Sequence, residues 1–410
     1  MLENAIWMLI LMLLTAWCGM LIIKKQPKRL WLIVLAELAL VCHYILTYVI
    51  FANGTEAMGT DGLIYHQVAK DVARQISSGT PLWAVKYEYT WYTVMVGIQY
   101  ALFGVNRFAA SFINSFLAVI SGYLLTAIAL NLNYSFKKSG FIGAVYLFIP
   151  SMFVWTTDTR KESLSFFISI LIWYIALRLL KEREWTVRRQ AFCIGLLCVL
   201  LYVSTLLRIY MLFTIGGGLL VGLFFHYLKT KRRMILFFGT AVLATCIILT
   251  CTTVLSNLND YHALPLDRSQ GGDEDLNDEM DSIFRTILDK DIPEAINGFL
   301  TKPHIEGVDN ITDISGNYAA VTLVRIEMIL WYVCMIISIF GFLNTLLEWN
   351  PYLIGIMAFI VSYSLINALI SENIADTYYR YRAAIIAPML LFADCRPFMR
   401  NLKSILIGKS

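Results

Sequence analysis

Long apolar runs separated by short polar junctions make up most of this 410-residue chain. A membrane-spanning helix needs about 20 consecutive apolar residues, and runs such as 5–23 and 30–51 have that length. The pattern predicts an all-α membrane protein with about eleven transmembrane helices. The predicted spans are 5–23, 30–51, 108–131, 140–156, 163–180, 191–207, 210–228, 234–255, 321–346, 352–371 and 382–396.

The first of two long polar segments occupies residues 53–107. Apolar residues recur at every fourth position from Ile64 to Ile76, with polar residues between them. This spacing predicts an amphipathic juxtamembrane helix lying along the outer membrane surface. Gly79-Thr80-Pro81 should end the helix, and the aromatic residues that follow, such as Trp83, favour the headgroup level.

The second long polar segment occupies residues 256–320. It begins with a stretch rich in Asp, Glu and Gly at 267–281, which is typical of mobile chain. Helical apolar spacing over 282–300 predicts one more amphipathic helix. The two polar segments are therefore the expected large outer loops.

The composition agrees with a membrane protein, because 58% of the residues are hydrophobic and only 15% are charged. A soluble domain is about a quarter charged. The first apolar run lacks a basic start and a small-residue cleavage site, which indicates a retained anchor rather than a signal peptide. We expect residues 1–410 to form a single polytopic membrane domain with no separate soluble domain. The eight cysteines lie in apolar runs without a CxxC pair, as small core residues do.

The distribution of Lys and Arg predicts the topology. More than half of the 33 basic residues fall in the junctions 24–29, 137–138, 178–189, 229–233 and 396–409. With eleven spans these junctions all lie on one side, which the positive-inside rule makes cytoplasmic. The N-terminus is then outside and the C-terminus cytoplasmic. The net charge of +4 therefore reflects topology, and no nucleic-acid partner is expected.

Asp61 opens the first outer loop and is the candidate catalytic residue. A carboxylate there could accept the proton of an acceptor hydroxyl as a general base. The alternative is structural, because Asp is favoured at the start of a helix as a cap and by the helix dipole. Tyr65 and His66 follow on the same predicted helix and are candidate substrate-binding residues.

The turn Asp158-Thr159-Arg160-Lys161-Glu162 precedes the span 163–180. Backbone donors at a helix start, together with Arg160 and Lys161, are typical of an anion site for a phosphate headgroup. Asp158 and Glu162 could add acidic groups to the same site. The alternative is an interfacial turn whose charges pair with one another.

Isolated arginines supply the other candidate substrate-binding residues. Arg208 divides two apolar runs with almost no loop, and a charge placed there needs a partner or a phosphate. Arg325 and Glu327 are two residues apart and cannot share a helix face. The alternative for these residues is an interhelical ion pair.

Arg380 and Arg382 alternate with tyrosines over residues 378–382. This pattern suits sugar stacking with phosphate binding, and it equally suits an aromatic belt with basic anchors. The histidines are scattered without the spacing of a metal site. The sequence identifies no certain cofactor, and a divalent metal requirement stays open.

These residues resemble the GT-C superfamily of integral-membrane glycosyltransferases, which includes protein O-mannosyltransferases and aminoarabinose transferases. The resemblance is carried by Asp61 with Tyr65 and Ala69, Leu102-Phe103-Gly104, Arg107, Asn114 and Leu117, Pro150-Ser151 with Lys161-Glu162, and Arg380-Tyr381-Arg382 with Pro388. It differs from most members in having a span before the acidic loop and a single acid between Thr60 and Gly62.

The resemblance implies a multi-span helical fold, a polyprenyl-phosphate sugar donor and an inverting transfer. By family position, Asp61 would be the base and Asp158 the acid of the second loop. One of the candidate arginines Arg208, Arg325, Arg380 or Arg382 would bind the donor phosphate.

The expected function is transfer of a sugar from a polyprenyl-phosphate carrier to an envelope glycan, lipid or protein acceptor, at the outer face of a bacterial plasma membrane. Membrane lipid is a further expected partner. One alternative is an O-antigen- or capsule-type polysaccharide polymerase or ligase that uses a diphosphate-linked oligosaccharide. A second is a lipid-carrier flippase or transporter, although such proteins often have paired halves and midplane breaks that this sequence lacks.

Overall fold

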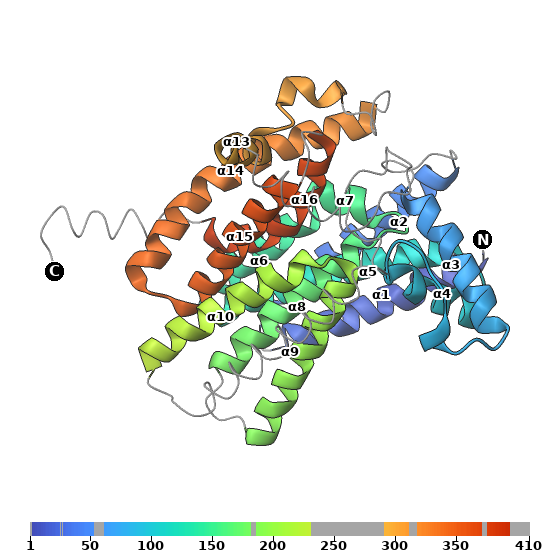
Figure 1. Cartoon of the computed structure of the whole chain (residues 1–410), viewed down its shortest axis with the longest axis horizontal. Coiled ribbons are helices and arrows are strands. Elements are labelled where there is room, and N and C mark those ends of the chain that lie inside the picture. The colour runs from blue at the N-terminus through green and yellow to red at the C-terminus, as the bar shows by residue number, and fades with distance from the viewer. Residues whose placement is uncertain are drawn as a thin grey trace, which may run out of the picture.

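The computed structural model describes residues 2–24, 26, 28–52, 61–181, 186–230, 291–310, 318–370 and 375–393. Within these ranges every regular element is a helix, and no strand occurs. The helices form an elongated bundle with a smaller group of helices at one end (Figure 1). An all-helical, multi-pass membrane architecture follows, as the apolar pattern predicts.

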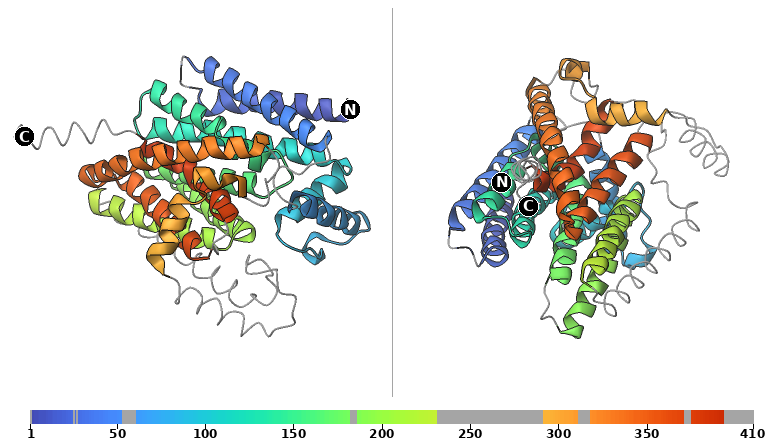
Figure 2. Two further views of the ribbon diagram at one scale, coloured as in Figure 1. Left: turned by 90° about the horizontal axis from the view of Figure 1, so that it is seen from above. Right: turned by 90° about the vertical axis from the view of Figure 1, so that its left-hand side faces the viewer.

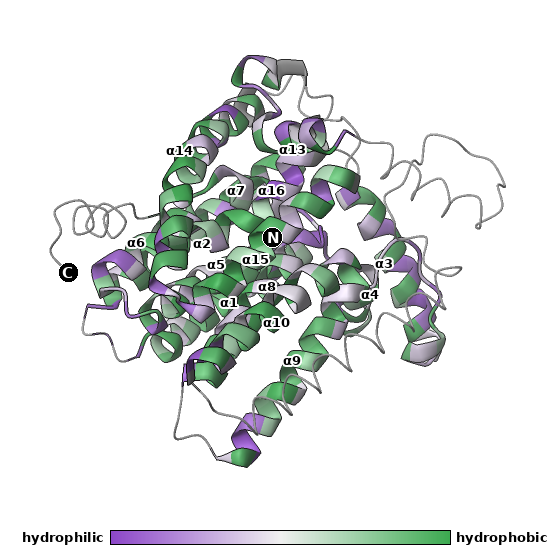
Figure 3. Ribbon diagram, turned by 60° about the vertical axis from the view of Figure 1, so that its left-hand side comes forward, coloured by the Kyte–Doolittle hydropathy of each residue, from purple (hydrophilic) through white to green (hydrophobic). Residues whose placement is uncertain are grey.

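Eight helices of the described chain are long and apolar enough to cross a membrane. Most of their length is hydrophobic, whereas hydrophilic residues gather at helix ends and loops (Figure 3). The eight are α1 (Leu2–Ile22), α2 (Leu30–Ala52), α5 (Arg107–Asn131), α8 (Glu162–Lys181), α9 (Val187–Leu207), α10 (Tyr210–Thr230), α14 (Tyr318–Glu348) and α15 (Pro351–Ile370).

The predicted span 140–156 is two helices, α6 (Phe136–Leu147) and α7 (Pro150–Thr156), bent by 49°. The break has a local cause, because the residue before a proline disfavours the helical region. Ile149 is extended, with ψ 132°, and Pro150 starts the next helix. Counting this pair as one span raises the total to nine within the described ranges.

Two other predicted spans bear on the count of eleven. The segment 234–255 lies outside the described residues. The segment 382–396 is described as far as residue 393, where α16 (Ala375–Met389, 15 residues) passes into the short 3-10 helix η4 (Leu390–Phe392). The total of eleven spans stays a prediction.

The bundle packs around α5, which contacts α1, α2, α6 and α8. Another close pair is α10 with α15, where glycines replace side chains. A Cβ on Gly218 would meet the carbonyl oxygen of Gly355 at 2.8 Å. The backbones of α10 and α15 therefore pack directly against each other. This close approach brings the side chains on either side of the contact nearer to one another.

The first polar segment forms a helical hairpin of α3 (Asp61–Ser77), the 3-10 helix η1 (Leu82–Ala84) and α4 (Tyr92–Phe103). The hairpin lies beside the N-terminus at one end of the bundle (Figures 1 and 2). The helix predicted over 64–76 is confirmed, and Gly79, with φ +93°, turns the chain after it. The amphipathic pattern of the second segment appears in α13 (Ile292–Thr301), followed by η3 (Ile305–Asn310). Residues 267–290 lie outside the described chain.

Candidate functional site

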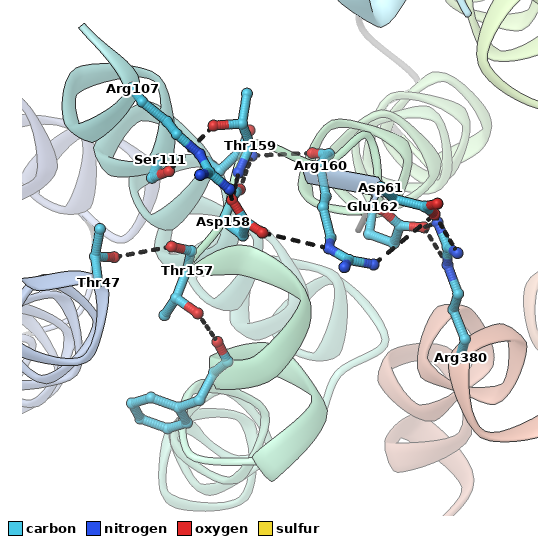
Figure 4. Close-up of polar contacts among 12 residues, drawn as sticks. Thr47, Asp61, Arg107, Ser111, Thr157, Asp158, Thr159, Arg160, Glu162 and Arg380 are labelled. Atoms are coloured by element: carbon cyan, nitrogen blue, oxygen red, sulfur yellow. Dashed lines mark hydrogen bonds and ion pairs between the residues drawn. The ribbon is translucent and has the colours of Figure 1, made fainter. Parts of the chain in front are cut away.

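Asp61 is the first residue of α3, and its carboxylate faces the bundle with about a third of the side chain exposed (32%). Arg380 of α16 donates from Nη1 to Asp61 Oδ2 at 2.7 Å, and Arg160 Nη1 lies 3.9 Å from the same oxygen. Figure 4 shows the side chains of Asp61 and Arg380 pointing toward each other. The predicted acid therefore contacts two of the predicted cations.

Gly62 allows α3 to approach the turn that precedes α8. A Cβ at this position would meet the carboxylate of Asp158 at 2.1 Å, so a larger residue would push the two elements apart. The buried Asp158 accepts from Arg107 Nη2 at 2.8 Å and from the backbone N–H of Thr159 at 2.6 Å. Arg160 Nε lies 3.7 Å from its other oxygen.

Asn114 of α5 fixes the shape of this turn. Its side-chain amide donates to the backbone carbonyls of Asp158 at 2.7 Å and Arg160 at 2.9 Å, and it also contacts the Tyr92 hydroxyl. Buried carbonyls need such donors, because an unpaired backbone group is costly away from water. The turn is therefore held from α4 and α5.

Glu162 begins α8 and is fully buried. Its Oε1 accepts from Arg380 Nε at 2.7 Å and from Arg208 Nη2 at 2.8 Å. Arg208 occupies the break between α9 and α10 and also donates to the Tyr210 hydroxyl. The interhelical ion pair foreseen as one alternative for Arg208 is thus present.

These side chains form one charged cluster. It consists of Asp61, Arg107, Asp158, Arg160, Glu162, Arg208 and Arg380, joined by hydrogen bonds or ion pairs. Four arginines face three carboxylates, and Lys161 lies beside them in the chain. The excess of positive charge suits an anionic ligand.

The surroundings set the charge states at the edge of the cluster. Burial alone would raise the pKa of Asp61, but Arg380 and Arg160 outweigh it, so its pKa lies below the ordinary value. Burial, together with the neighbouring charge of Arg208, lowers the pKa of Lys161 to about 7. Asp61 is therefore ionised at neutral pH, while Lys161 is poised between its two charge states.

Several buried polar atoms at the cluster have no hydrogen-bond partner within the described chain. They include Glu162 Oε2, Arg208 Nε, Ser163 Oγ and Trp155 Nε1. The Trp155 ring lies 5.3 Å from the Arg160 guanidinium carbon and 5.5 Å from that of Arg380. Buried polar groups are usually satisfied, so a concentration of unsatisfied ones beside stacked arginines is typical of a binding site.

The remaining candidates lie around or away from the cluster. Tyr65 is buried and packs against Tyr89 and Tyr92, and burial raises its pKa above the ordinary value. His66 points to the Tyr100 hydroxyl, 2.8 Å from Nδ1. These two residues line the α3–α4 side of the site.

Arg382 and Arg325 are not among the residues that the ion pairs of the charged cluster join. Arg382 donates to the backbone carbonyls of Leu300 and Lys302 at the end of α13. Arg325 is partly buried in α14. Its neighbour Glu327 is buried and accepts from Ser151 N–H and from Tyr379, so the two residues do occupy different faces.

Four contributors to the cluster and its walls were not among the predicted site residues: Arg107, Asn114, Tyr92 and Trp155. Arg107 had a readable signal, since it is a lone charge at the start of a long apolar span. Asn114 was among the residues that carry the family resemblance, but it had no assigned role. The only signal of Trp155 was its polar ring nitrogen within apolar surroundings.

No group of three or more His, Cys, Asp or Glu side chains suited to a metal ion occurs in the part of the chain that the structure describes. No family model matches the chain, and no curated protein is similar to it. Fold and site together define a multi-pass helical membrane protein with a buried, arginine-rich cluster at one end of its bundle.

Proposed function

We propose that the protein is a membrane glycosyltransferase of the GT-C type that transfers a sugar from a polyprenyl-phosphate carrier to an envelope glycan, lipid or protein acceptor. The observation that carries the proposal is the contact of one partly exposed carboxylate, Asp61, with arginines of a buried cationic site. A transferase with a phosphate leaving group needs this combination of a base and an anion site.

The proposed reaction uses one base and one anion site. The acceptor hydroxyl oxygen bonds to the anomeric carbon while the bond from that carbon to the phosphate oxygen breaks. Asp61 takes the hydroxyl proton and later passes it to water. The polyprenyl phosphate leaves with the bonding electron pair, and Arg208, Arg380 and Lys161 stabilise its negative charge.

The ion pair between Arg380 and Asp61 needs to change during this reaction. A carboxylate held at low pKa by an arginine is a weak base. A phosphate that binds Arg380 competes with Asp61 for the guanidinium, and the pKa of Asp61 then rises. Donor binding would in this way activate the base only when the leaving group is in position.

We further propose that the chain crosses a bacterial plasma membrane eleven times, with the N-terminus outside and the C-terminus cytoplasmic. Support comes from the charged cluster and the α3–α4 hairpin, which share one end of the bundle. At the other end Lys181 donates to the carbonyl of Asn131, and Lys229 to that of Trp349. Basic residues are typical of the cytoplasmic end.

A second candidate function is a polysaccharide polymerase or ligase with a diphosphate-linked donor. One observation favours it: all three carboxylates of the charged cluster are ion-paired with arginines. In such an enzyme the arginines bind the diphosphate, and Asp61 only orients them.

Replacement of Asp61 tests the choice, with Asp71 of the same helix as the matched control. Asp71 is exposed and pairs only at the surface, with Arg74. We expect Asp61→Asn to lower transfer of labelled sugar about 100- to 10,000-fold, the range of general-base catalysis, and Asp71→Asn to leave it unchanged. Equal activities of the two variants would rule out the base and favour the ligase, provided that Arg380→Gln is inactive.

A further inference from the structure

The α3–η1–α4 hairpin carries apolar residues at its two ends. At one end Leu82 is 54% exposed and Trp83 is 89% exposed. At the other, Leu102 and Phe103 are also largely exposed. Large apolar side chains that stay exposed in pairs at the two ends of a helical hairpin indicate an interaction surface.

The tip at Leu82 and Trp83 is held in a fixed shape. Gln75 of α3 donates from Nε2 to the Lys86 carbonyl at 2.8 Å and accepts from the Lys86 N–H at 2.9 Å. Val85 packs against Val72 and Val94 inside the hairpin. Because Val85 turns inward, Leu82 and Trp83 are presented outward by a rigid loop.

Each end of the hairpin lies beside a residue some way inside a neighbouring bundle helix, and not at the end of that helix. Phe103 packs edge-on against Trp7 of α1, with ring centroids 5.3 Å apart. Tyr87 lies near Tyr202 of α9, and burial and this phenol raise the pKa of Tyr87. Trp7 and Tyr202 are each five residues from their helix ends, Leu2 and Leu207, or about 7–8 Å along the axis.

The neighbours at that depth are exposed apolar surfaces of the bundle. Ile6 and Leu9 of α1 and Val199 and Tyr202 of α9 are exposed apolar residues of membrane-length helices. The opposite face of α3 is polar, with Asp71 and Arg74 paired at the surface. The hairpin thus has one polar, solvent-exposed face, and its apolar ends lie level with exposed apolar residues of the bundle. This combination fits a position at the membrane interface.

We infer that Leu82–Trp83 and Leu102–Phe103 insert into the lipid leaflet on the side of the charged cluster and anchor the hairpin at both ends. The partner is the headgroup–acyl boundary of the bilayer. Asp61, at the start of α3, is thereby held at the level of lipid headgroups. This inference concerns the lipid surface and does not depend on the transfer reaction.

Spin labels on the full chain in phosphatidylcholine–phosphatidylglycerol nanodiscs test the anchor. Labels are attached at Trp83→Cys, Leu82→Cys and Phe103→Cys, with Arg74→Cys as the matched control and the unsubstituted protein as the background. Arg74 lies on the same hairpin with its side chain 77% exposed. Thermal denaturation and size-exclusion profiles of each variant verify folding.

We expect the three anchor positions to collide more with dissolved oxygen than with a water-soluble nickel complex, and Arg74→Cys to show the reverse ratio. If Trp83→Cys and Leu82→Cys behave like Arg74→Cys, that tip is in water and the inference is overturned. If the labels collide with neither reagent, a protein surface covers the tip, and the lipid anchor is equally refuted.

Discussion

Two arginines of α16, only two residues apart, belong to regions with different character. Arg380 enters the charged cluster, where its guanidinium bridges Asp61 and Glu162. Arg382 points to the opposite face and donates to backbone carbonyls of Leu300 and Lys302. Residues two apart on a helix face different ways, so one short sequence serves two regions.

The region around Arg382 is a closed structural network. Trp331 donates to the Leu300 carbonyl at 2.8 Å, and Tyr332 to the Thr301 carbonyl at 2.7 Å. Together with Arg382, they cap the C-terminal carbonyls of α13, which the sequence of α13 leaves without helical partners. The charges here are satisfied by the fold itself.

The charged cluster differs from this network because it contains a buried carboxylate oxygen without a hydrogen-bond partner in the described part of the chain. Three donors from Arg208 and Arg380 converge on Glu162 Oε1, while its buried Oε2 has no hydrogen-bond partner within the described residues. A network built for stability would use both oxygens. Buried charge alone therefore does not mark a site, whereas buried charge with unsatisfied atoms beside a partly exposed carboxylate does.

Between the two arginines, the larger expected effect comes from Arg380→Gln. The variant loses the guanidinium that binds both Asp61 and Glu162 and, in the proposed reaction, the leaving phosphate. We expect kcat/KM for a polyprenyl-phosphate sugar to fall roughly 100- to 1,000-fold, as when one charge-stabilising donor is removed. Activity near that of the unsubstituted protein, with folding verified by size exclusion, would show that the cluster is structural.

Arg382→Gln should have the opposite profile. Charge-assisted hydrogen bonds contribute about 1.5–3 kcal/mol, so we expect thermal denaturation in detergent to shift downward by several degrees. Activity per folded molecule should stay close to that of the unsubstituted protein. An intact melting temperature with lost transfer would instead assign Arg382 to substrate binding, as first expected from the sequence.

The division between Arg380 and Arg382 shows where sequence reasoning stops. Their spacing predicts opposite faces, but only tertiary packing decides which face meets Asp61. Eight of the predicted spans were readable because a bilayer demands a fixed apolar length. Helix α3 was readable because its apolar residues recur at the helical period.

Other features of the site have no local signal. Asn114 reads as one polar residue in an apolar run, yet it holds the carbonyls of Asp158 and Arg160. The break before Pro150 was missed because the apolar run continues through it, although proline supplies the physical reason for it. Long-range pairs such as Arg107 with Asp158 depend on which helices pack together.

The charge of Lys161 gives a pH-dependent test of whether the charged cluster binds the donor. Because burial lowers its pKa to about 7, it loses its charge as pH rises from 7 to 9. If it binds the donor phosphate, KM for the donor should rise over that range, by up to about tenfold. Lys161→Arg should abolish the pH effect, since arginine stays charged. A KM that rises equally in both proteins would exclude Lys161 as its source.

His66 should give the smallest effect, on stability rather than transfer. Burial, with Lys70 and Arg107 nearby, lowers its pKa from 6.5 to about 4. Between pH 6.5 and about pH 4, the unfolded chain therefore binds a proton at His66 that the folded protein does not bind. Stability from this group is complete above pH 6.5 and declines as the pH falls toward 4.

The slope of melting temperature against pH measures this contribution. Because His66 is only half buried, solvent screening reduces its effect, and we expect a difference of a few degrees between pH 7 and 4.5. His66→Gln, which can keep a hydrogen bond to Tyr100, should flatten the slope. His304→Gln, at an exposed site after α13, should leave it unchanged. Equal slopes in all three proteins would mean that His66 is hydrated. The α3–α4 side of the site would then be open to water beside Tyr100.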